Sequence, residues 1–281
     1  MSNETTSSTL AELYTDVIQE ALFTFQETSV MRPLVTTYGI TGQGKVVQVP
    51  IYGAISASAV AEGTDLTNTA VDPTSVDITA SEIGVMTTLT DLGRDSASRN
   101  VGSDIGKLFG DGLAKKVDTD LATLFSSFSV DVGGATIELT PELLFKAQAT
   151  LRSLNVPAPY YGVFHPKACF NLKKVLTNAG YSTSSNAVSE VGNQAMKDGF
   201  VGRVAGIDVY ENANIAIDGS DDSIGAVFHP SSIGLAMKSD MKIETQRDAS
   251  IRGTEIVASM TVGQAVVKST YGVKITVDSA I

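Results

Sequence analysis

The feature that most constrains the fold is one long helical pattern over residues 91–128. Apolar side chains recur along it at helical spacing, while alanine, aspartate and lysine occupy the other faces. A helix covering most of this segment would be roughly 40–50 Å long. A compact domain cannot bury such a helix along its whole length, so we expect it to be an extended structural element. Gly102, Gly106 and Gly110, spaced four apart, would either permit close backbone approach or weaken the helix.

Two segments before this helix have to pack on other parts of the protein or on a neighbouring chain. Residues 10–31 have helical spacing of apolar side chains, with a capping-box pattern at Thr9 and Glu12. We expect this helix to pack on its own domain or on a neighbouring chain. Residues 45–60 and 76–89 are typical of two strands joined by a polar stretch. A hairpin of roughly 40 residues lacks the apolar faces for a core of its own, so it should project.

The second half alternates helices and strands around a polar loop at Asn178–Gly199. Helices are predicted at Pro141–Leu154, with Thr140 as N-cap, and at Pro166–Leu176. The predicted strands are Tyr160–Phe164, Arg203–Tyr210, Gly225–Phe228 and Ile233–Met237, followed by a mostly β stretch from Lys242 to Val277.

Composition and charge exclude several classes of protein. The chain has 281 residues, 43% hydrophobic and 18% charged, which is typical of a globular protein. A net charge of −11 argues against tight nucleic-acid binding and against an anionic membrane surface. No apolar run approaches the ~20 residues of a membrane span, and no secretory signal is visible, so a cytosol-like compartment is expected. The single cysteine, Cys169, excludes an intramolecular disulfide.

The charges are also segregated along the chain. Residues 1–31 and 46–93 contain no lysine or arginine but several carboxylates, whereas the basic residues fall mostly in the second half. Surfaces of opposite sign could bring copies of the chain together. A simply solvated acidic hairpin explains the same pattern, and the sequence leaves both readings open.

Each candidate catalytic or binding motif lacks residues that its chemistry requires. Residues Gly39–Val46 fit a phosphate-binding loop but lack its Ser or Thr and lead into a strand, not a helix. His165 and Cys169 lie four apart, without the third residue of a nucleophilic triad or enough ligands for zinc.

The remaining candidates are also better explained structurally. His165 and His229 end two copies of the string Val-Phe-His-Pro, which fits a strand terminated by proline. Asp218–Asp222 lacks the spacing of a calcium loop, and Glu62 and Asp65 lie at the hairpin tip, where no pocket would raise a pKa. We therefore expect no catalytic residue, metal site or cofactor, and no enzyme activity.

The order of these parts resembles the major capsid proteins of tailed bacteriophages, whose shell fold is shared with encapsulins. The resemblance covers nearly the whole chain and is one of architecture. The V-x-V-P-I-Y-G string within Val46–Gly53 looks like the entry to the family's extended loop, and Pro166–Leu176 resembles its strand-to-helix step. Lys242–Val277 looks like its terminal strands.

The resemblance implies an α+β chain with the HK97-like capsid fold. It divides the chain into an N-arm (1–32), an extended-loop hairpin and its entry (33–90), a spine helix with part of the peripheral domain (91–140), an axial domain (141–237) and the peripheral return strands (238–281). Asn178–Gly199 would lie at the five- and six-fold axes. The implied function is a major capsid protein whose pentamers and hexamers form the icosahedral shell around double-stranded DNA.

Partners follow from the same resemblance: many copies of the chain, a portal, and in some cases a decoration protein, with no membrane. Because the arm starts near Met1, a separate scaffolding protein is implied unless the chain is already processed. The hairpin has no lysine between Val46 and Gly93, so no covalent cross-link from it is expected. Alternatives are an encapsulin-type compartment, an enzyme using Cys169 and His165, and a β-rich tail or adhesion protein.

Overall fold

The structure is a computed structural model that describes residues 20–21, 24–25, 29–53, 55, 57, 59–63, 65, 68, 70–96, 101–177 and 200–280. Its strands are β1 (Thr36–Gly39), β2 (Val46–Ile51), β3 (Thr74–Thr79), β4 (Ser81–Thr90), β5 (Val130–Asp131), β6 (Tyr160–Phe164), β7 (Phe200–Val204), β8 (Ile207–Glu211), β9 (Asp222–Phe228), β10 (Ile233–Asp248), β11 (Gly253–Val266) and β12 (Gly272–Asp278). Its helices are α2 (Asp91–Ser96), α3 (Val101–Thr123), α4 (Pro141–Ser153) and α5 (Pro166–Thr177), with 3-10 helices η1 (Arg32–Leu34), η2 (Leu124–Ser127), η3 (Pro230–Ser232) and η4 (Ser269–Tyr271).

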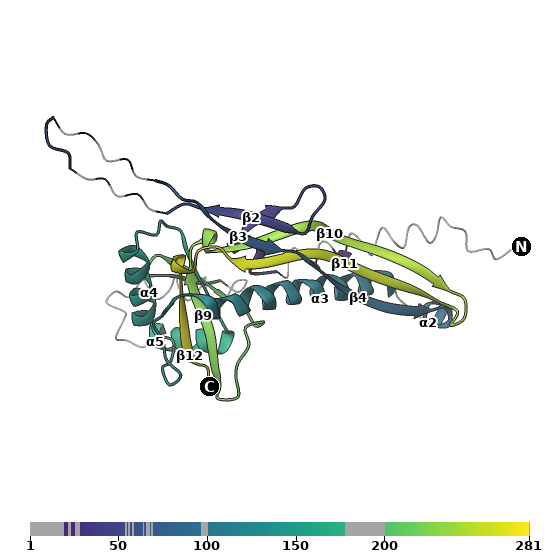
Figure 1. Cartoon of the computed structure of the whole chain (residues 1–281). Coiled ribbons are helices and arrows are strands. Elements are labelled where there is room, and N and C mark those ends of the chain that lie inside the picture. Colours follow the sequence, from purple (N-terminus) through teal and green to yellow (C-terminus); the bar gives the residue numbers. More distant parts are fainter. Residues whose placement is uncertain are drawn as a thin grey trace, which may run out of the picture.

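The strands form two large sheets and one small one (Figure 1). The four-stranded sheet has the order β1-β10-β11-β4 and the six-stranded sheet the order β5-β12-β9-β6-β8-β7. The remaining pair, β2 and β3, stands as a two-stranded sheet beside them. The mixed α+β architecture agrees with the sequence-based prediction.

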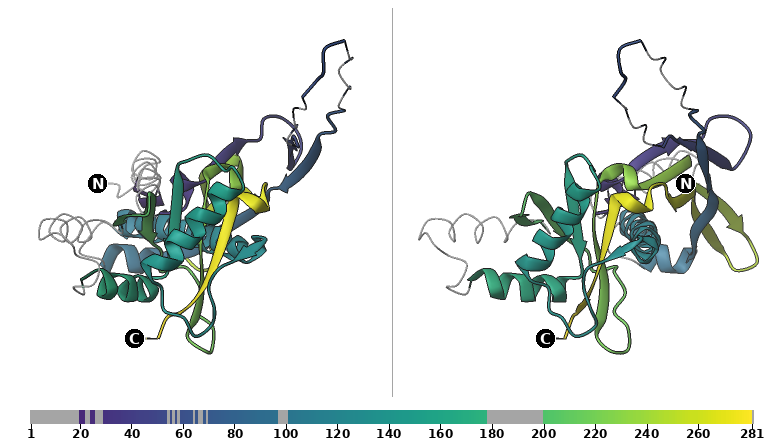
Figure 2. Two further views of the ribbon diagram at one scale, coloured as in Figure 1. Left: turned by 90° about the vertical axis from the view of Figure 1, so that its left-hand side faces the viewer. Right: turned by 60° about the vertical axis from the view of Figure 1, so that its left-hand side comes forward.

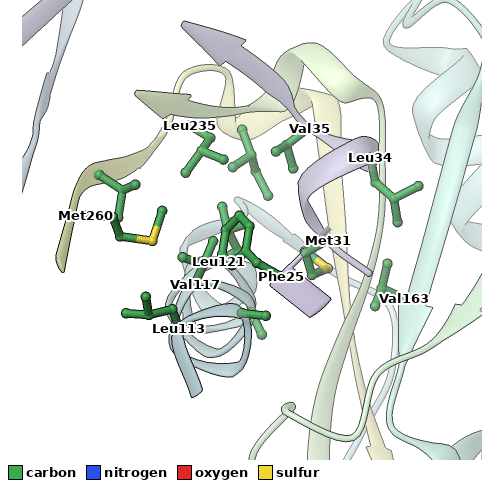
Figure 3. Close-up of a cluster of buried hydrophobic side chains, with 14 of the residues drawn as sticks. Phe25, Met31, Leu34, Val35, Leu113, Val117, Leu121, Val163, Leu235 and Met260 are labelled. Atoms are coloured by element: carbon green, nitrogen blue, oxygen red, sulfur yellow. The ribbon is translucent and has the colours of Figure 1, made fainter. Parts of the chain in front are cut away.

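Helix α3 supports the four-stranded sheet along most of its length. Its apolar stripe, which includes Leu113, Val117 and Leu121, is buried against sheet residues such as Leu235 and Met260 (Figure 3). The core of this half therefore lies mainly between α3 and this sheet, as the amphipathic pattern predicts, and side chains of the six-stranded sheet such as Val163 and Phe228 also belong to it.

The predicted single helix over 91–128 is wrong in its bounds. Helix α2 ends at Ser96, residues 97–100 lie outside the described part, and α3 ends at Thr123, which gives α3 a length of roughly 35 Å. The last predicted turn is the 3-10 helix η2. Side chains three apart eclipse in a 3-10 helix, so Phe125 and Phe128 can both pack against Phe228, with ring centroids 5.7 and 6.3 Å away.

A second core lies under the six-stranded sheet, which α4 and α5 cover (Figure 2). Leu144, Leu151 and Leu172 of these helices are fully buried against Val209 and Ile275 of the sheet. The predictions for α4, β6, α5 and β9 are confirmed to within a few residues, and Pro141 occupies the first turn of α4 as expected.

The two large sheets are joined where the chain crosses twice, from β9 to β10 and from β11 to β12. The Ser232 carbonyl accepts the amide N–H of Val267 (2.8 Å) and of Lys268 (3.1 Å). The His229 amide donates to the Tyr271 carbonyl at 3.0 Å. The two crossings are therefore hydrogen-bonded to each other.

The predicted hairpin is confirmed only at its base. Strands β2 and β3 pair from Val46↔Thr79 to Ile51↔Thr74, but the second predicted strand splits at Ala80, and β4 pairs with β11 instead. Gly263 of β11 makes this crossing possible, because a Cβ there would lie 2.2 Å from the Thr79 carbonyl oxygen. A local sequence pattern does not show such a change of strand partner.

Two further strand predictions need correction. Residues 203–210 form not one strand but the hairpin β7–β8, turned at Ala205 and Gly206, whose φ angles of 55° and 70° suit a tight two-residue turn. Strand β10 does not end at Met237 but continues to Asp248 through register shifts between Met237 and Lys242.

Other predictions fall partly or wholly outside the described residues. Of the predicted helix at 10–31, Glu20, Ala21, Thr24 and Phe25 are described and helical, whereas Ser29–Met31 are described and not helical, so the predicted C-terminal bound is wrong. The Thr9 cap and the loop Asn178–Gly199 lie outside the described part. None of the helices that the structure describes is long and apolar enough to span a membrane.

Candidate assembly surfaces

The N-terminal segment packs on α3 through a glycine. A Cβ at Gly110 would lie 2.4 Å from the Ala21 carbonyl oxygen and 3.0 Å from the Phe25 amide nitrogen. The absence of a side chain therefore allows close approach of the two backbones, one of the two roles considered for the glycines. Phe25 is buried there, with the guanidinium of Arg32 5.2 Å from its ring centroid.

A buried carboxylate on α3 holds the next part of this segment. Asp118 is fully buried, and its Oδ1 accepts from the Ser29 hydroxyl (2.8 Å) and the Met31 amide (3.3 Å). Its Oδ2 accepts from the Val30 amide at 3.0 Å. Burial raises the pKa of Asp118, and the three hydrogen bonds act in the opposite direction. Asp118 thus fixes the segment that leads from the N-terminus into η1 and β1.

The described residues of the hairpin tip, which spans 52–73, project away from both large sheets (Figures 1 and 2). Tyr52 and Ile55 among them are 63% and 62% exposed. At the base of the hairpin, Val49 and Ile78 pack in a core with Ala236 and Val267. Exposed apolar side chains on a projecting segment are suited to contact with a partner.

The opposite end of the molecule is closed by an ion pair. Arg247 of β10 makes two hydrogen bonds to the Asp91 carboxylate at the start of α2, of 2.6 and 2.7 Å. The Asp91 amide donates to the Arg252 carbonyl at 2.9 Å. The turn between β10 and β11 is thereby joined to the first residue of α2.

Comparisons with solved structures cover nearly the whole chain. The capsid of the cyanophage P-SCSP1u is similar at 19% identity and a TM-score of 0.68, over 89% of this chain and 88% of that one. The capsid of Ralstonia phage GP4 matches at 9% identity and a TM-score of 0.72, over 91% and 92%. The chain has the HK97-like capsid fold. A virus-like particle from Pyrococcus furiosus also matches, at 13% identity and a TM-score of 0.63, over 94% and 99%.

The capsid fold is found by comparison of structures, whereas the sequence comparisons find no match. No model of a protein family matches the sequence, and a search of curated proteins finds no match either. The fold recognised from the order of elements is therefore confirmed by architecture alone.

Within the capsid fold, the motif resembling a phosphate-binding loop is a strand connection. Gly42 and Gly44 have φ angles of 88° and 127°, and the segment links β1 to β2 without opening a helix. The Lys238 ammonium donates to the Gly44 carbonyl at 2.7 Å. These glycines serve a turn.

The structure places the His165 ring and the Cys169 thiol in different environments. His165 precedes α5, and its Nδ1 accepts the Lys167 amide at 3.1 Å, while the Cys169 thiol is fully buried in the second core. Burial raises the pKa of Cys169, so the thiolate is disfavoured. Burial, with Lys167 nearby, lowers the pKa of His165.

His229 has the same role after β9 as His165 has after β6. Its Nδ1 accepts the Ser231 amide at 3.2 Å, and its ring lies edge-on to Tyr271. Burial and the nearby Lys268 lower the pKa of His229. Strands β6 and β9 are antiparallel neighbours, so each Val-Phe-His-Pro string ends a strand and caps the following turn.

The acidic candidates also lie in turns. The Asp218 carboxylate accepts the amides of Ser220 (2.8 Å) and Asp222 (2.9 Å), which closes the turn before β9. Glu62 and Asp65 lie in the hairpin tip. Among the described residues, no group of three or more His, Cys, Asp or Glu side chains is arranged to hold a metal ion.

The residue that sequence reasoning missed is Asp118. Aspartates of the long helix were assigned to its polar faces, yet Asp118 lies one turn from the buried Ala114 and Leu121. That position on the apolar stripe was the available signal, because a carboxylate there must find hydrogen-bond donors from another segment.

Proposed function

We propose that this chain is the major capsid protein of a tailed bacteriophage, which assembles into the icosahedral head shell around double-stranded DNA. The observation that carries the proposal is the match to capsid structures over about nine-tenths of both chains. Function cannot be concluded from a fold alone. The similarity covers nearly all of both chains, however, and it therefore supports a capsid role for the whole chain and not for one module of it.

Features of the chain that a monomer leaves unexplained support the proposal. The projecting tip exposes Tyr52 and Ile55, and no lysine or arginine accompanies its carboxylates. In a closed shell, such surfaces are covered by neighbouring copies, and weak contacts are multiplied by symmetry. The net charge of −11 also suits a container that must enclose DNA without binding it tightly.

The parts of the chain receive corresponding roles in this proposal. The N-arm is 1–32, the extended loop with its entry 33–90, the spine helix and part of the peripheral domain 91–140, the axial domain 141–237, and the peripheral return strands 238–281. Pentamers and hexamers of the chain form the shell in the host cytoplasm. A separate scaffolding protein, a portal and in some systems a decoration protein complete the partners, and the chain itself performs no catalysis.

An encapsulin-type compartment is the second candidate. The similarity to the virus-like particle from Pyrococcus furiosus favours it, since that match covers almost all of both chains. The two candidates share a fold and differ in size and contents, so shell diameter and cargo distinguish them.

The test is assembly of the purified protein. The chain is expressed alone and with its neighbouring genes, and the products are examined by negative-stain microscopy and by size-exclusion chromatography with light scattering. We expect closed shells or capsomers of five and six copies, with head-sized shells for a phage protein and small ones for a compartment. A monodisperse monomer under both conditions would refute both candidates.

A further inference from the structure

A hollow lies between the C-terminal half of α3 and one face of the six-stranded sheet. Its volume is about 580 Å³, a size typical of binding pockets in proteins. Ala122 of α3 and Ile215 are buried where they line it, and Ile224 of β9 packs against the same core. Thr123 and Ala216 also line it and are exposed. The hollow therefore combines apolar side chains with an opening to solvent.

Carboxylates gather beside this hollow. Asp218 and Asp222 line it, and none of the described residues that line it is basic. Burial raises the pKa of Asp222, and three nearby carboxylates raise it further, those of Asp218, Asp278 and Asp221. Like charges this close repel one another, so a positive charge beside the hollow would be stabilised.

Helix α5 has a surface of complementary chemistry. Lys167, Phe170 and Lys174 lie three and four residues apart, so they share one face of the helix. Phe170 is 49% exposed, and the Lys174 side chain is 54% exposed, with the Glu138 carboxylate 3.7 Å from its ammonium. This face thus presents an aromatic ring between two lysines.

The charge of α5 distinguishes it from the other described helices. It contains three lysines and no carboxylate, whereas α2, α3 and α4 each contain at least one aspartate or glutamate. Lys115 and Lys116 of α3, for example, pair with aspartates of their own helix at 2.8 and 2.7 Å. Among the described helices, α5 is therefore the one whose charge matches an acidic hollow.

We propose that this hollow receives α5 from a second copy of this chain. Phe170 then lies against the apolar side chains of the hollow, and Lys167 and Lys174 lie beside its carboxylates. At 1.5 Å of rise per residue, the two lysines are about 10 Å apart along the helix, with Phe170 between them. Burial of the aromatic ring stabilises the contact, and the opposite charges fix its orientation.

The occupant has to come from another copy, because the two surfaces lie on opposite faces of one sheet. Ile224 of β9 and its pair Thr276 of β12 line the hollow on one face. The next residue of β12, Ile275, points to the other face, where it belongs to the same core as Leu172 of α5. No bending of a single chain could bring α5 into its own hollow without breaking this core.

A contact between two different surfaces is head-to-tail. Repeated around an axis, such a contact closes into a ring, which is the geometry of a capsomer. The inference thus rests on the proposed function and names two surfaces that meet in one of its subunit contacts.

Disulfide trapping in assembled particles tests the proposal. Ala216→Cys is combined in one chain with Lys167→Cys, Phe170→Cys or Lys174→Cys in turn, because a disulfide requires Cβ atoms about 3.5–4.5 Å apart. After mild oxidation of intact shells or capsomers, a non-reducing gel should show a ladder of linked subunits for at least one pair. The single variants, and Ala216→Cys combined with Ala149→Cys on the exposed face of α4, should remain monomeric.

Each other outcome overturns the inference. Dimers from an α5 cysteine alone mean that α5 contacts α5 of another copy. Closed shells with no cross-link from any pair refute the contact and leave the capsid function standing. Failure of the unaltered chain to form shells or capsomers refutes both.

Charge variants test the same contact without added cysteines. Ala216→Lys and Lys174→Glu should each raise several-fold the protein concentration needed for assembly, at an unchanged melting temperature of the unassembled protein. The two changes combined should assemble better than either alone, because the new charges attract each other. Ala213→Lys is the matched control, since Ala213 is exposed in the same loop but does not line the hollow.

The combined variant also distinguishes α5 from any other occupant of the hollow. Normal assembly of Ala216→Lys refutes the contact outright. If Ala216→Lys impairs assembly and the losses of the two single variants simply add, the hollow receives a partner other than α5, and the proposal is refuted.

Discussion

Removing the Asp118 carboxylate should detach the N-terminal segment from α3 at a measurable energetic cost. In Asp118→Ala, the Ser29 hydroxyl and the Val30 and Met31 amides lose their acceptor. A buried donor left unsatisfied costs about 1–3 kcal/mol, and part of the sum is recovered because a carboxylate no longer has to be buried. We expect the free energy of unfolding to fall by about 3 kcal/mol.

The pH dependence of the same site provides a second measurement. Burial raises the pKa of Asp118, so the folded state binds its proton more readily than the unfolded state does. The native protein should therefore gain stability relative to Asp118→Asn as the pH falls from neutral through the raised pKa. The gain is complete below the usual pKa of an aspartate, where the side chain is protonated in both states.

Urea unfolding of the unassembled protein, followed by far-UV circular dichroism because the chain has no tryptophan, measures both quantities. Asp120→Ala is the matched control. Its partly exposed carboxylate pairs with the exposed Lys116 at 2.7 Å, and we expect a loss below about 1 kcal/mol. Equal stability of Asp118→Ala and the native chain would refute the assignment of Asp118 as the anchor. Identical pH profiles for Asp118→Asn and the native chain would contradict the raised pKa.

Three further predictions concern other contacts. Gly110→Ala should destabilise the protein by about 2 kcal/mol and speed hydrogen exchange at Phe25, because the added methyl overlaps the Ala21 carbonyl; unchanged exchange would contradict the close approach. Arg247→Ala should leave the melting temperature almost unchanged, since its ion pair with Asp91 is exposed, and a large fall in melting temperature would contradict this. Cys169 should react with a thiol reagent only after unfolding in guanidinium, because its thiol is buried and its pKa is raised; rapid native labelling would count against the buried position.

The elements that sequence could predict are those defined by local signals. Helix α4 starts at a proline that suits its first turn, and β6 is separated from α5 by His165, with Pro166 as the first residue of α5. These signals depend on the conformations of a few consecutive residues, so tertiary contacts did not alter them.

The errors arise where distant residues decide. The division of one predicted strand into β3 and β4 depends on Gly263, which lies far along the chain and lets Thr79 cross over β11. The extension of β10 beyond Met237 depends on pairing with β11, which tolerates polar residues on an exposed face. The periodicity of α3 places Asp118 on the apolar stripe, but its hydrogen-bond donors come from residues 29–31, and that periodicity does not identify them.

The parallel pairing of β1 with β10 has a consequence for synthesis of the chain. The Thr36 hydroxyl donates to the Pro230 carbonyl, 194 residues away, and β1 completes its sheet only beside β10. At about 5–20 residues per second, translation separates the emergence of these strands by about 10–40 s. During that interval, β4 also lacks β11, and the four-stranded sheet does not exist. The four-stranded sheet thus cannot form before the C-terminal strands have been made, and under the proposed capsid function the order of synthesis delays oligomerisation until the subunit is complete.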